Sequence, residues 1–503
     1  MAVTSLSSPA TVPAHILITG ATGFLGQALL ERLLTDHPYT RITLLIRAGR
    51  HDSARDRLRA LLQRPVFGAV GNSARRHVLA DSIGVVEADL TGAYSLPADL
   101  DAVVHCASSV KFDEGLDTAF DTNVAGTQRL YAALAEGNPT THVIHVSTAY
   151  VNSGRVPVSF DEPVRHDTDW RTELARVRAL SATLRHPDHQ GHAEAKLSLL
   201  GAQRASELGW TDVYTLTKAL GERVAEELWA AGRLTVLRPS IIESALTRPY
   251  PGWIDGFKVA DPVIAAYARG QLRHFPGHPD TVLDLIPVDL VVNATLASLL
   301  NPPHPGAPRY LQVASGTSNP LTLGDLLSHA RSYFGSHPWI DATGRACYPA
   351  DFRYRSPKQL QTRVAYAQRA LAAAARVLDL SPASQRTALR RRVATSHTRL
   401  ELLSEYMALY TPYTCGQTVF DTSEAAQLSR NCHPLLRFEA SSLDWSHYLP
   451  QVHLPAVVDL MKAHRRPLRV AQPGAVATSA HGARASRQAR RAQQRLQVSE
   501  ELR

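Results

Sequence analysis

Short apolar runs alternate with longer amphipathic stretches along the chain up to about Asn301. Five of these runs have the composition of strands that are buried on both faces of a parallel sheet: 16–18, 41–46, 85–90, 103–109 and 142–150. The stretches between them carry apolar residues at helical spacing, as in 25–34. The alternation predicts an α/β fold with a Rossmann-like, doubly wound parallel sheet.

The pattern changes after this alternating region. Prolines punctuate 302–308, and 310–314 predicts one more strand, which we expect to return to a smaller substrate lobe. A helix is predicted over 323–334, and from about Ala342 onward we expect helices alone, notably 358–380 and 384–410. Five apolar positions on the second long helix fit either a packed core or an exposed groove or membrane-facing surface: Leu389, Val393, Leu400, Leu403 and Met407.

A chain of 503 residues exceeds what one hydrophobic core holds comfortably, so we expect more than one domain. The predicted division has a flexible N-terminus (1–14), a dinucleotide-binding domain with substrate-binding elements (15–340), a mostly helical C-terminal domain (341–463) and a basic, disordered tail (464–503). Within the dinucleotide-binding domain, an insert covers about 153–205.

Three glycines at a spacing of three follow the first predicted strand. Gly20, Gly23 and Gly26 stand between that strand and the first predicted helix. Glycines allow a tight turn and a close approach of the backbone to a pyrophosphate, which the N–H groups at the helix N-terminus attract. The position of the triplet between a strand and a helix supports a dinucleotide site over a ligand-free turn.

The end of the second strand indicates which dinucleotide is bound. An NAD site has an acidic residue about twenty positions after the glycines, which accepts a hydrogen bond from the ribose 2′-OH. Arg47 occupies this position and Arg50 lies close by. Because a guanidinium binds a 2′-phosphate, we expect NADPH. Asp89, after the third strand, is expected at the adenine edge. Asn123, at the start of a later helix, is expected to have a structural role.

A Tyr and a Lys four residues apart supply candidate acid chemistry. Tyr214 and Lys218 share one helix face, and the fifth strand ends in Ser147 and Thr148. An ammonium about 6 Å from a phenol favours the phenolate by roughly 3 kcal/mol, or ~2 pK units. Thr148, aided by Ser147, would donate to a carbonyl oxygen, Tyr214 would deliver a proton, and Lys218 would also hold the ribose hydroxyls. The set predicts hydride transfer to or from a carbonyl carbon.

Several strings of the sequence resemble the fatty acyl-CoA reductases, a family of extended short-chain dehydrogenase/reductases. They are 109–114 (SVKFDE), 146–152 (VSTAYVN), 214–222 (YTLTKALGE), 237–242 (LRPSII), 251–255 (PGWID), 284–294 (DLIPVDLVVNA) and 438–448 (FEASSLDWSHY). The resemblance implies NADPH-dependent reduction of a long-chain acyl thioester to an aldehyde and onward to the alcohol. It implies Thr148, Tyr214 and Lys218, with Ser147, as catalytic positions.

The resemblance and the motifs together give a full set of expected cofactor contacts. These residues are Gly20, Thr22, Gly23, Phe24, Leu25, Gly26, Arg47, Arg50, Asp89, Leu90, Ala107, Tyr214, Lys218, Pro239, Ser240 and Ile241.

Other functions stay open at this point. One alternative is a reductase of acyl groups bound to a carrier protein, because a carrier protein and CoA present the acyl group on the same phosphopantetheine arm. A steroid or sugar-nucleotide dehydrogenase would share the cofactor site, although the interval from Thr148 to Tyr214 is longer than in sugar epimerases. A non-enzymatic NADP-binding adaptor would not need the Thr-Tyr-Lys set.

The insert contains three histidines in seven residues, His186, His189 and His192. Pro187 and Gly191 deny them a regular helical face, so we expect an exposed loop and no metal site. The helix-like stretch 170–185 lies in the same insert, which is predicted to form a lid or a flank over the substrate site.

The net charge of +9 is concentrated in the tail, where nine arginines and two glutamates within 464–503 give +7. We expect disorder over 472–481, and 483–496 could form a basic helix on an anionic membrane surface. The arginines of the tail are not interleaved with aromatic residues, and no nucleic-acid recognition fold accompanies them. We therefore expect no specific nucleic-acid binding. Four scattered cysteines suit a reducing compartment, and no apolar run approaches the ~20 residues of a membrane span. We therefore expect a cytoplasmic protein with peripheral membrane contact at most; the oligomeric state stays open.

Overall fold

The computed structural model describes residues 12–186, 193–379 and 386–464. Its centre is a parallel sheet with the strand order β3-β2-β1-β4-β5-β7-β11. The strands are β1 (His15–Thr19), β2 (Arg41–Ile46), β3 (Gly84–Glu87), β4 (Ala102–His105), β5 (His142–Val146), β7 (Arg233–Pro239) and β11 (Arg309–Val313). The chain starts at the centre of the sheet and winds outward in both directions, which is the order of a dinucleotide-binding sheet. The predicted fold class is confirmed.

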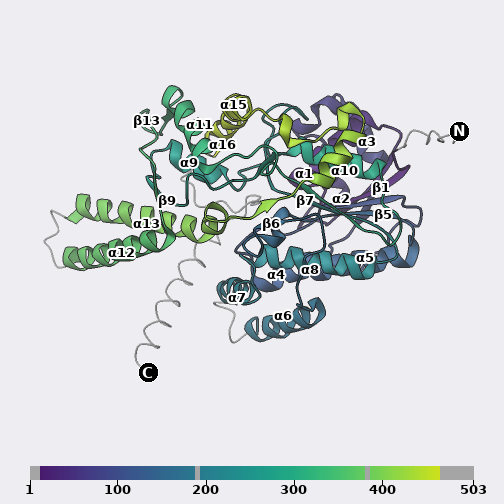
Figure 1. Cartoon of the computed structure of the whole chain (residues 1–503), viewed down its shortest axis with the longest axis horizontal. Coiled ribbons are helices and arrows are strands. Elements are labelled where there is room, and N and C mark those ends of the chain that lie inside the picture. The colour runs from purple at the N-terminus through teal and green to yellow at the C-terminus, as the bar shows by residue number, and fades with distance from the viewer. Residues whose placement is uncertain (1–11, 187–192, 380–385, 465–503) are drawn as a thin grey trace.

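Helices cover both faces of the sheet (Figure 1). Successive side chains of β1 point to opposite faces, because a strand repeats every two residues. Ile16 and Ile18 therefore join the hydrophobic cluster under α1 and α10, whereas Leu17 joins the cluster under α5. The helices of the first face are α1 (Phe24–Asp36), α2 (Ala54–Leu62), α3 (Ser73–Ser82) and α10 (Val288–Leu300), with the 3-10 turn η1 (Pro65–Val70). Those of the second face are α4 (Leu116–Phe120), the π-helical turn η2 (Asp121–Ala125), α5 (Gly126–Gly137) and α8 (Val213–Leu228).

A smaller lobe follows β7. It is built from β8 (Ile241–Glu243), α9 (Asp261–Ala268), β9 (His274–Pro276), β10 (Leu285–Pro287), α11 (Leu323–Ser336), β12 (Trp339–Ile340), β13 (Ala346–Cys347) and β14 (Arg353–Arg355). The strand expected to return to this lobe, β11, instead pairs in parallel with β7 at the edge of the main sheet. That expectation was wrong because an apolar strand flanked by prolines carries no information about which sheet it joins.

The insert after β5 lies on the outside of the second helical face. After the 3-10 turn η3 (Ala149–Asn152) it contains β6 (Val158–Ser159), α6 (Trp170–Leu184) and α7 (Ala193–Glu207). The two helices pack against α4 and α8, as Figure 1 shows. The lid or flank over the substrate site stays a prediction. Of the histidine stretch, 187–192 lies outside the described residues.

The C-terminal segment begins with the helical hairpin of α12 (Pro357–Asp379) and α13 (Arg386–Thr414), which extends to one side of the molecule (Figure 1). Met407 of α13 is buried against Leu360 and Val364 of α12, so this end of the helix belongs to a packed core. Leu389, near its other end, is 47% exposed. Leu400 and Leu403 are half-buried and line an open cavity of about 1250 Å³.

The chain then returns to the sheet through β15 (Val419–Phe420), α14 (Ser423–Asn431), η6 (Pro434–Leu436), η7 (Ala440–Ser442), α15 (Trp445–His447), the π-helical turn η8 (Tyr448–His453) and α16 (Leu454–Ala463). Ala425 and Phe438 are buried in the same cluster as Ile16 of β1. The expectation of helices alone after about Ala342 was wrong, because β13, β14 and β15 are strands. Strands of two or three residues are too short to show an alternating pattern.

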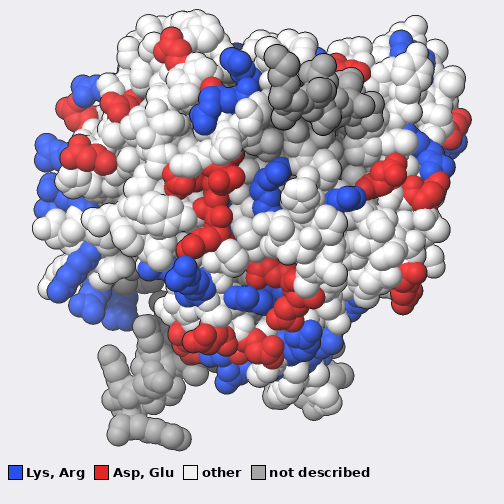
Figure 2. Space-filling model, turned by 45° about the vertical axis from the view of Figure 1, so that its right-hand side comes forward, with Lys and Arg blue, Asp and Glu red and all other residues white. Residues whose placement is uncertain are grey.

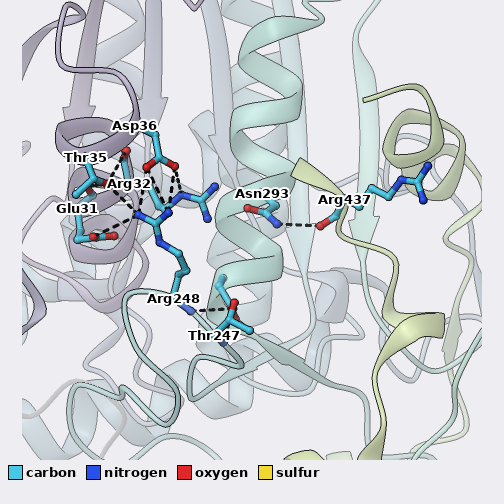
Figure 3. Close-up of polar contacts among 9 residues, drawn as sticks. Glu31, Arg32, Thr35, Asp36, Thr247, Arg248, Asn293 and Arg437 are labelled. Carbon is cyan, nitrogen blue, oxygen red and sulfur yellow. Dashed lines mark hydrogen bonds and ion pairs between the residues drawn. The ribbon is translucent and has the colours of Figure 1, made fainter. Parts of the chain in front are cut away.

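Polar contacts fasten the later segments to the first helical face (Figure 3). Arg248 forms ion pairs with Asp36 at 3.2 Å and with Glu31 at 3.6 Å, both on α1. Asn293 Nδ2 of α10 donates to the carbonyl oxygen of Arg437 at 2.8 Å. The smaller lobe and the C-terminal segment are therefore held to the dinucleotide-binding part by direct contacts.

Charges of both signs are interspersed over the face shown in Figure 2. This agrees with the sequence, since +7 of the net +9 belongs to 464–503. Apart from His464, that tail lies outside the described residues, as do the stretches predicted to be disordered or helical within it. Within the described parts of the chain, no helix is both long enough and apolar enough to cross a bilayer.

Candidate active site

The glycine triplet forms a turn that tolerates no side chain at two of its three positions. Gly20 has a φ of +74°, and a Cβ there would lie 2.6 Å from the backbone nitrogen of Ala107. A Cβ on Gly26 would lie 2.2 Å from the carbonyl oxygen of Gly20. Gly23 is the N-cap residue that immediately precedes α1, and no described side chain caps this helix N-terminus. The turn thus brings β1, β4 and open N–H groups together, which fits a bound pyrophosphate.

The loop 251–258 packs on this turn. The ring of Trp253 lies 4.9 Å from that of Phe24, and Lys258 Nζ lies 4.1 Å from the centre of the Phe24 ring. Asp255 Oδ2 accepts a hydrogen bond of 2.7 Å from Gln27 Nε2, which also donates to Thr22 O. Reasoning from the residues alone missed this arrangement, because nothing in the loop's spacing relates it to a turn more than two hundred positions earlier.

The two arginines expected near the adenosine end lie after β2. Arg47 Nη1 is 3.8 Å from Asp89 Oδ2. This ion pair connects the end of β2 with the end of β3. Both side chains are exposed enough to contact a ligand, at 71% and 43%. Arg50 is exposed in the same loop, whereas Leu90 is buried and packs toward Gly126. Arg47, Arg50 and Asp89 are therefore open at the surface, and Leu90 belongs to the core.

The two expected catalytic hydroxyls meet at the carboxyl end of β5. The side chain of Thr148 lies close enough to the phenol of Tyr214 to lower its pKa. Thr148 Oγ1 also lies 3.5 Å from the carbonyl oxygen of Pro239, at the end of β7. Ser147 Oγ is buried, and no hydrogen-bond partner for it lies among the described residues. Ser147, Thr148 and Tyr214 therefore form a polar site at the sheet edge where doubly wound folds bind ligands.

Lys218 lies one helical turn along α8. Its Nζ donates a hydrogen bond of 2.5 Å to the carbonyl oxygen of Val146, and its side chain is buried. Burial lowers the pKa of Lys218 to about 8, because the charged ammonium loses its hydration. The neighbouring His105 and His145 have lowered pKa values through burial and are neutral at pH 7, so neither adds positive charge there.

The expected acidification of Tyr214 does not occur in the protein by itself. Burial raises the pKa of Tyr214, and this outweighs the effect of the nearby Thr148 side chain, which lowers the same pKa. The sequence estimate neglected desolvation of the phenolate and the direction of Lys218 Nζ, which points to a backbone carbonyl. Tyr214 is therefore a protonated hydrogen-bond donor at neutral pH.

Two further contacts hold the helix of Tyr214 and Lys218 in place. Glu222, on the same helix, accepts hydrogen bonds of 3.0 and 2.7 Å from the fully buried guanidinium of Arg238 on β7. Asn123 Oδ1 accepts a hydrogen bond of 2.8 Å from the backbone N–H of Ser109. Asn123 Nδ2 donates to the carbonyl oxygen of Ser109 at 3.0 Å and to Thr217 Oγ1 at 2.9 Å. The structural role expected for Asn123 fits these contacts. Arg238 was not singled out, since its partner became evident only from the packing of β7 on α8.

Aromatic residues surround Tyr214 on its apolar side. The rings of Phe112 and Tyr214 are 5.7 Å apart, and Tyr413 of α13 lies 5.2 Å from Phe112 and 5.0 Å from Tyr150. Tyr413 also donates a hydrogen bond of 3.0 Å to Asp212 Oδ2, and Asp212 caps α8. We call Phe112, Tyr150 and Tyr413 the aromatic wall. Sequence reasoning missed it because Tyr413 comes from a distant helix.

The arrangement fits a nicotinamide dinucleotide. The turn lacks room for side chains at Gly20 and Gly26, and among the described residues no side chain caps the helix N-terminus or pairs with the buried Ser147 Oγ. Pro239, Ser240 and Ile241 close the same edge, since Pro239 contacts Thr148 and Ile241 begins β8. Phe24 and Leu25 belong to the first turn of α1. The expected contacts near the nicotinamide and the pyrophosphate thus lie along one edge of the sheet.

Comparisons with known proteins agree with this site. The sequence profile of the family described as male sterility protein, an NAD-binding family, matches residues 18–295. The chain is 29% identical over 493 residues to fatty acyl-CoA reductase 2, chloroplastic, of Arabidopsis thaliana, covering 88% of this chain and 77% of that protein. It is 27% identical over 489 residues to the alcohol-forming fatty acyl-CoA reductase of Simmondsia chinensis, covering 88% and 96%.

Solved structures show the same fold. The terminal R domain of the myxalamid PKS-NRPS pathway superposes with a TM-score of 0.57 at 18% identity, covering 90% of this chain and 92% of that one. The reductase domain of a nonribosomal peptide synthetase from Mycobacterium tuberculosis gives a TM-score of 0.51 at 19% identity, covering 90% and 92%. The profile match extends over more than half of the chain, from β1 to α10. The chain therefore belongs to the male sterility protein family of NAD-binding domains and is a relative of the fatty acyl-CoA reductases.

Proposed function

We propose that this protein uses NADPH to reduce long-chain fatty acyl-CoA thioesters to aldehydes and onward to primary alcohols. The observation that carries the proposal is the proximity of the Thr148 and Tyr214 side chains at the carboxyl end of β5, beside the glycine turn. The names of the related reductases from Arabidopsis thaliana and Simmondsia chinensis support an acyl-CoA substrate.

The hydroxyls of Thr148 and Tyr214 would both donate to the oxygen of the thioester carbonyl. A bound reduced nicotinamide supplies hydride to the carbonyl carbon. Negative charge then grows on the oxygen, where two positioned donors stabilise it best. Because burial keeps Tyr214 protonated at neutral pH, its phenol is ready to transfer a proton to that oxygen. The resulting hemithioacetal expels the thiol and leaves an aldehyde, which the same residues can hold for a second reduction.

Lys218 would stabilise the state that follows proton transfer. With a pKa of about 8 its ammonium is mostly charged at pH 7, and it lies one helical turn from Tyr214. The positive charge favours the phenolate that remains on Tyr214. Lys218 therefore acts on the product side of the proton transfer, whereas Thr148 acts on the oxygen itself.

NADPH is proposed over NADH because of the end of β2. Arg47 and Arg50 are exposed there, and no acidic residue occupies the position that binds a ribose 2′-OH in NAD sites. Asp89 is paired with Arg47, which leaves the guanidinium partly free for a phosphate. For the acyl part of the substrate, the aromatic wall beside Tyr214 supplies the apolar contacts.

We also propose peripheral membrane contact through the tail. Its nine arginines would each gain about 1 kcal/mol near an anionic lipid surface. Such contact would bring the enzyme close to its substrate and product, because long-chain acyl groups and alcohols are apolar and enter membranes.

One assay tests the proposed activity. The pure full-length chain is incubated with NADPH and palmitoyl-CoA, and NADPH consumed, CoA freed and lipid products are all quantified. Two NADPH per CoA with hexadecanol as product supports the full proposal, and one NADPH with hexadecanal restricts it to the first reduction. A parallel reaction with palmitoyl-carrier protein shows which acyl donor is preferred. A parallel reaction with NADH shows which hydride donor is preferred. Absence of thiol release from either thioester, as CoA or as holo-carrier protein, would contradict the proposed function.

A further inference from the structure

Three side chains from distant parts of the chain meet in the interior, away from the site described above. Glu243 ends β8, Asp261 begins α9 and His453 ends the π-helical turn η8. All three are fully buried, with exposed fractions of 0%. One oxygen or nitrogen from each lies within 4.8 Å of the others. We call these residues the buried triad.

Each member of the buried triad has one polar atom anchored by the protein. Glu243 Oε1 accepts from the backbone N–H of Ala260 at 3.3 Å, and Asp261 Oδ2 accepts from the N–H of Lys258 at 2.6 Å. His453 Nδ1 contacts Ser244 Oγ at 3.1 Å. These contacts fix the orientation of all three side chains without using their second polar atoms.

The second polar atoms have no partner. Glu243 Oε2, Asp261 Oδ1 and His453 Nε2 are buried, and no hydrogen-bond partner for any of them lies among the described residues. Leaving such atoms unpaired is unfavourable, because each loses its hydration on burial without gaining a hydrogen bond in return. Three of them in one place indicate that something absent from the protein chain satisfies them together.

The hydrogen-bond chain around His453 determines what kind of ligand fits. Tyr448 Oη donates to Ser244 O at 2.8 Å and lies 3.2 Å from Ser244 Oγ. A consistent chain has His453 Nδ1–H donating to Ser244 Oγ and the Ser244 hydroxyl donating to Tyr448. His453 Nε2 then presents a lone pair to Asp261 Oδ1, 3.4 Å away. Two acceptors that face each other, with a second carboxylate nearby, require a positive charge between them.

Burial raises the pKa of both carboxyls, and the charge of Lys258 lowers it through space, but its ammonium does not contact them. Lys258 Nζ donates to the carbonyl oxygen of Asp255 and lies over the ring of Phe24. Within the described residues, no ion pair of 4.0 Å or less joins Lys258 to Glu243 or Asp261. No described side chain therefore neutralises the two carboxylates by contact, which leaves a divalent cation or a proton shared by the carboxyls.

We propose that Glu243, Asp261 and His453 bind a structural Zn²⁺ ion. One imidazole nitrogen and two carboxylate oxygens are zinc ligands, and a hydrogen bond on the other imidazole nitrogen is the usual support of a ligating histidine. In a tetrahedral zinc site with bonds of about 2.1 Å, neighbouring ligand atoms are about 3.4 Å apart. The separation of His453 Nε2 from Asp261 Oδ1 matches this spacing. The ion would join β8, α9 and the C-terminal segment.

Metal content of the pure protein tests this site directly. The full-length chain, without a histidine tag, is equilibrated with Zn²⁺, passed through a desalting column with a weak chelator and analysed by plasma mass spectrometry. We expect about one zinc per chain, and at least a tenfold loss in Glu243→Gln and His453→Gln. His142→Gln is the matched control, because His142 is also buried but lies on β5 outside the buried triad. A variant with His186, His189 and His192 replaced by Ala controls for the histidine stretch of the insert.

A second measurement covers variants that fail to fold. X-ray absorption at the zinc edge of the wild-type protein should show one imidazole, oxygen ligands otherwise, and no sulfur. Zinc below about a tenth of an equivalent in the wild type would overturn the site. So would wild-type zinc content in folded His453→Gln, or sulfur ligation in the absorption spectrum. In those cases a proton shared by the two carboxyls would satisfy the buried atoms instead.

Discussion

The active-site edge and the buried triad both gather polar side chains, but they do so in opposite ways. At the active-site edge, the catalytic candidates come in two short strings, Ser147 with Thr148 and Tyr214 with Lys218. Thr148 and Lys218 have hydrogen-bond partners, Tyr214 is only half-buried, and Ser147 Oγ is the one of the four side-chain groups that is buried without a partner among the described residues. The buried triad draws one residue from each of three elements, all fully buried, and each keeps one polar atom unpartnered.

The difference separates a site built for a passing ligand from one built for a permanent one. Donors that are already held can be redirected to a substrate oxygen at small cost, which suits catalysis. Three buried atoms that lack partners in one place carry a larger and lasting energetic penalty, which a resident ligand would remove. The two sites should therefore respond independently to substitution, and the following variants test that independence.

The largest effect is expected from Gly26→Ala. Its Cβ would lie 2.2 Å from the carbonyl oxygen of Gly20, so the turn must open, at a cost of about 1–3 kcal/mol in stability. Dinucleotide binding, measured by fluorescence titration, should fall below detection while zinc content stays at the wild-type level. Gly137→Ala is the matched control, because nothing lies within 4 Å of its Cβ position. Normal dinucleotide binding by Gly26→Ala would show that the turn is not the cofactor cradle.

A smaller effect is expected from pH. Lys218 is charged below its pKa of about 8 and loses its charge as the pH rises through that value. The kcat/KM for acyl-CoA reduction should therefore fall above pH 8, by about tenfold per pH unit. Lys218→Met should flatten this limb and lower the rate about a hundredfold at pH 7. A profile that keeps its alkaline limb in Lys218→Met would assign that limb to another group.

The smallest effect is expected where the C-terminal segment reaches the active-site edge. Tyr413→Phe removes the hydrogen bond to Asp212, which keeps its bond from the backbone N–H of Thr215. We expect a loss of about 1 kcal/mol in the free energy of unfolding. The kcat should change by no more than about threefold, since the ring of the aromatic wall remains. A much larger loss of kcat would mean that the Tyr413 hydroxyl itself contacts the substrate.

Local motifs allowed most of the dinucleotide-binding part to be predicted. The glycine turn, β2 and the Tyr214–Lys218 helix depend on spacing within a few residues, which a sequence shows directly. The position of β11 and the short strands β13, β14 and β15 depend on pairing partners elsewhere in the chain. Periodicity carries no information about such partners.

The same limit applied to the chemistry. Burial was not visible in the spacing of Tyr214 and Lys218, so the effect of desolvation on the pKa of Tyr214 was missed. Arg238 and Glu222 lie in two separate motifs, and their bidentate contact emerged only from the packing of β7 on α8. His453 is almost two hundred positions from Asp261, and no motif connects them.

The most direct test of the central claim compares Tyr214→Phe with Tyr333→Phe, which changes a tyrosine on the distant helix α11. Acyl-CoA-dependent NADPH oxidation and NADPH affinity are measured for both variants and the wild type. If Tyr214 donates the proton, Tyr214→Phe should lose about 10²- to 10⁴-fold in kcat with NADPH affinity unchanged, and Tyr333→Phe should match the wild type. Turnover by Tyr214→Phe within a few-fold of the wild type would contradict the account.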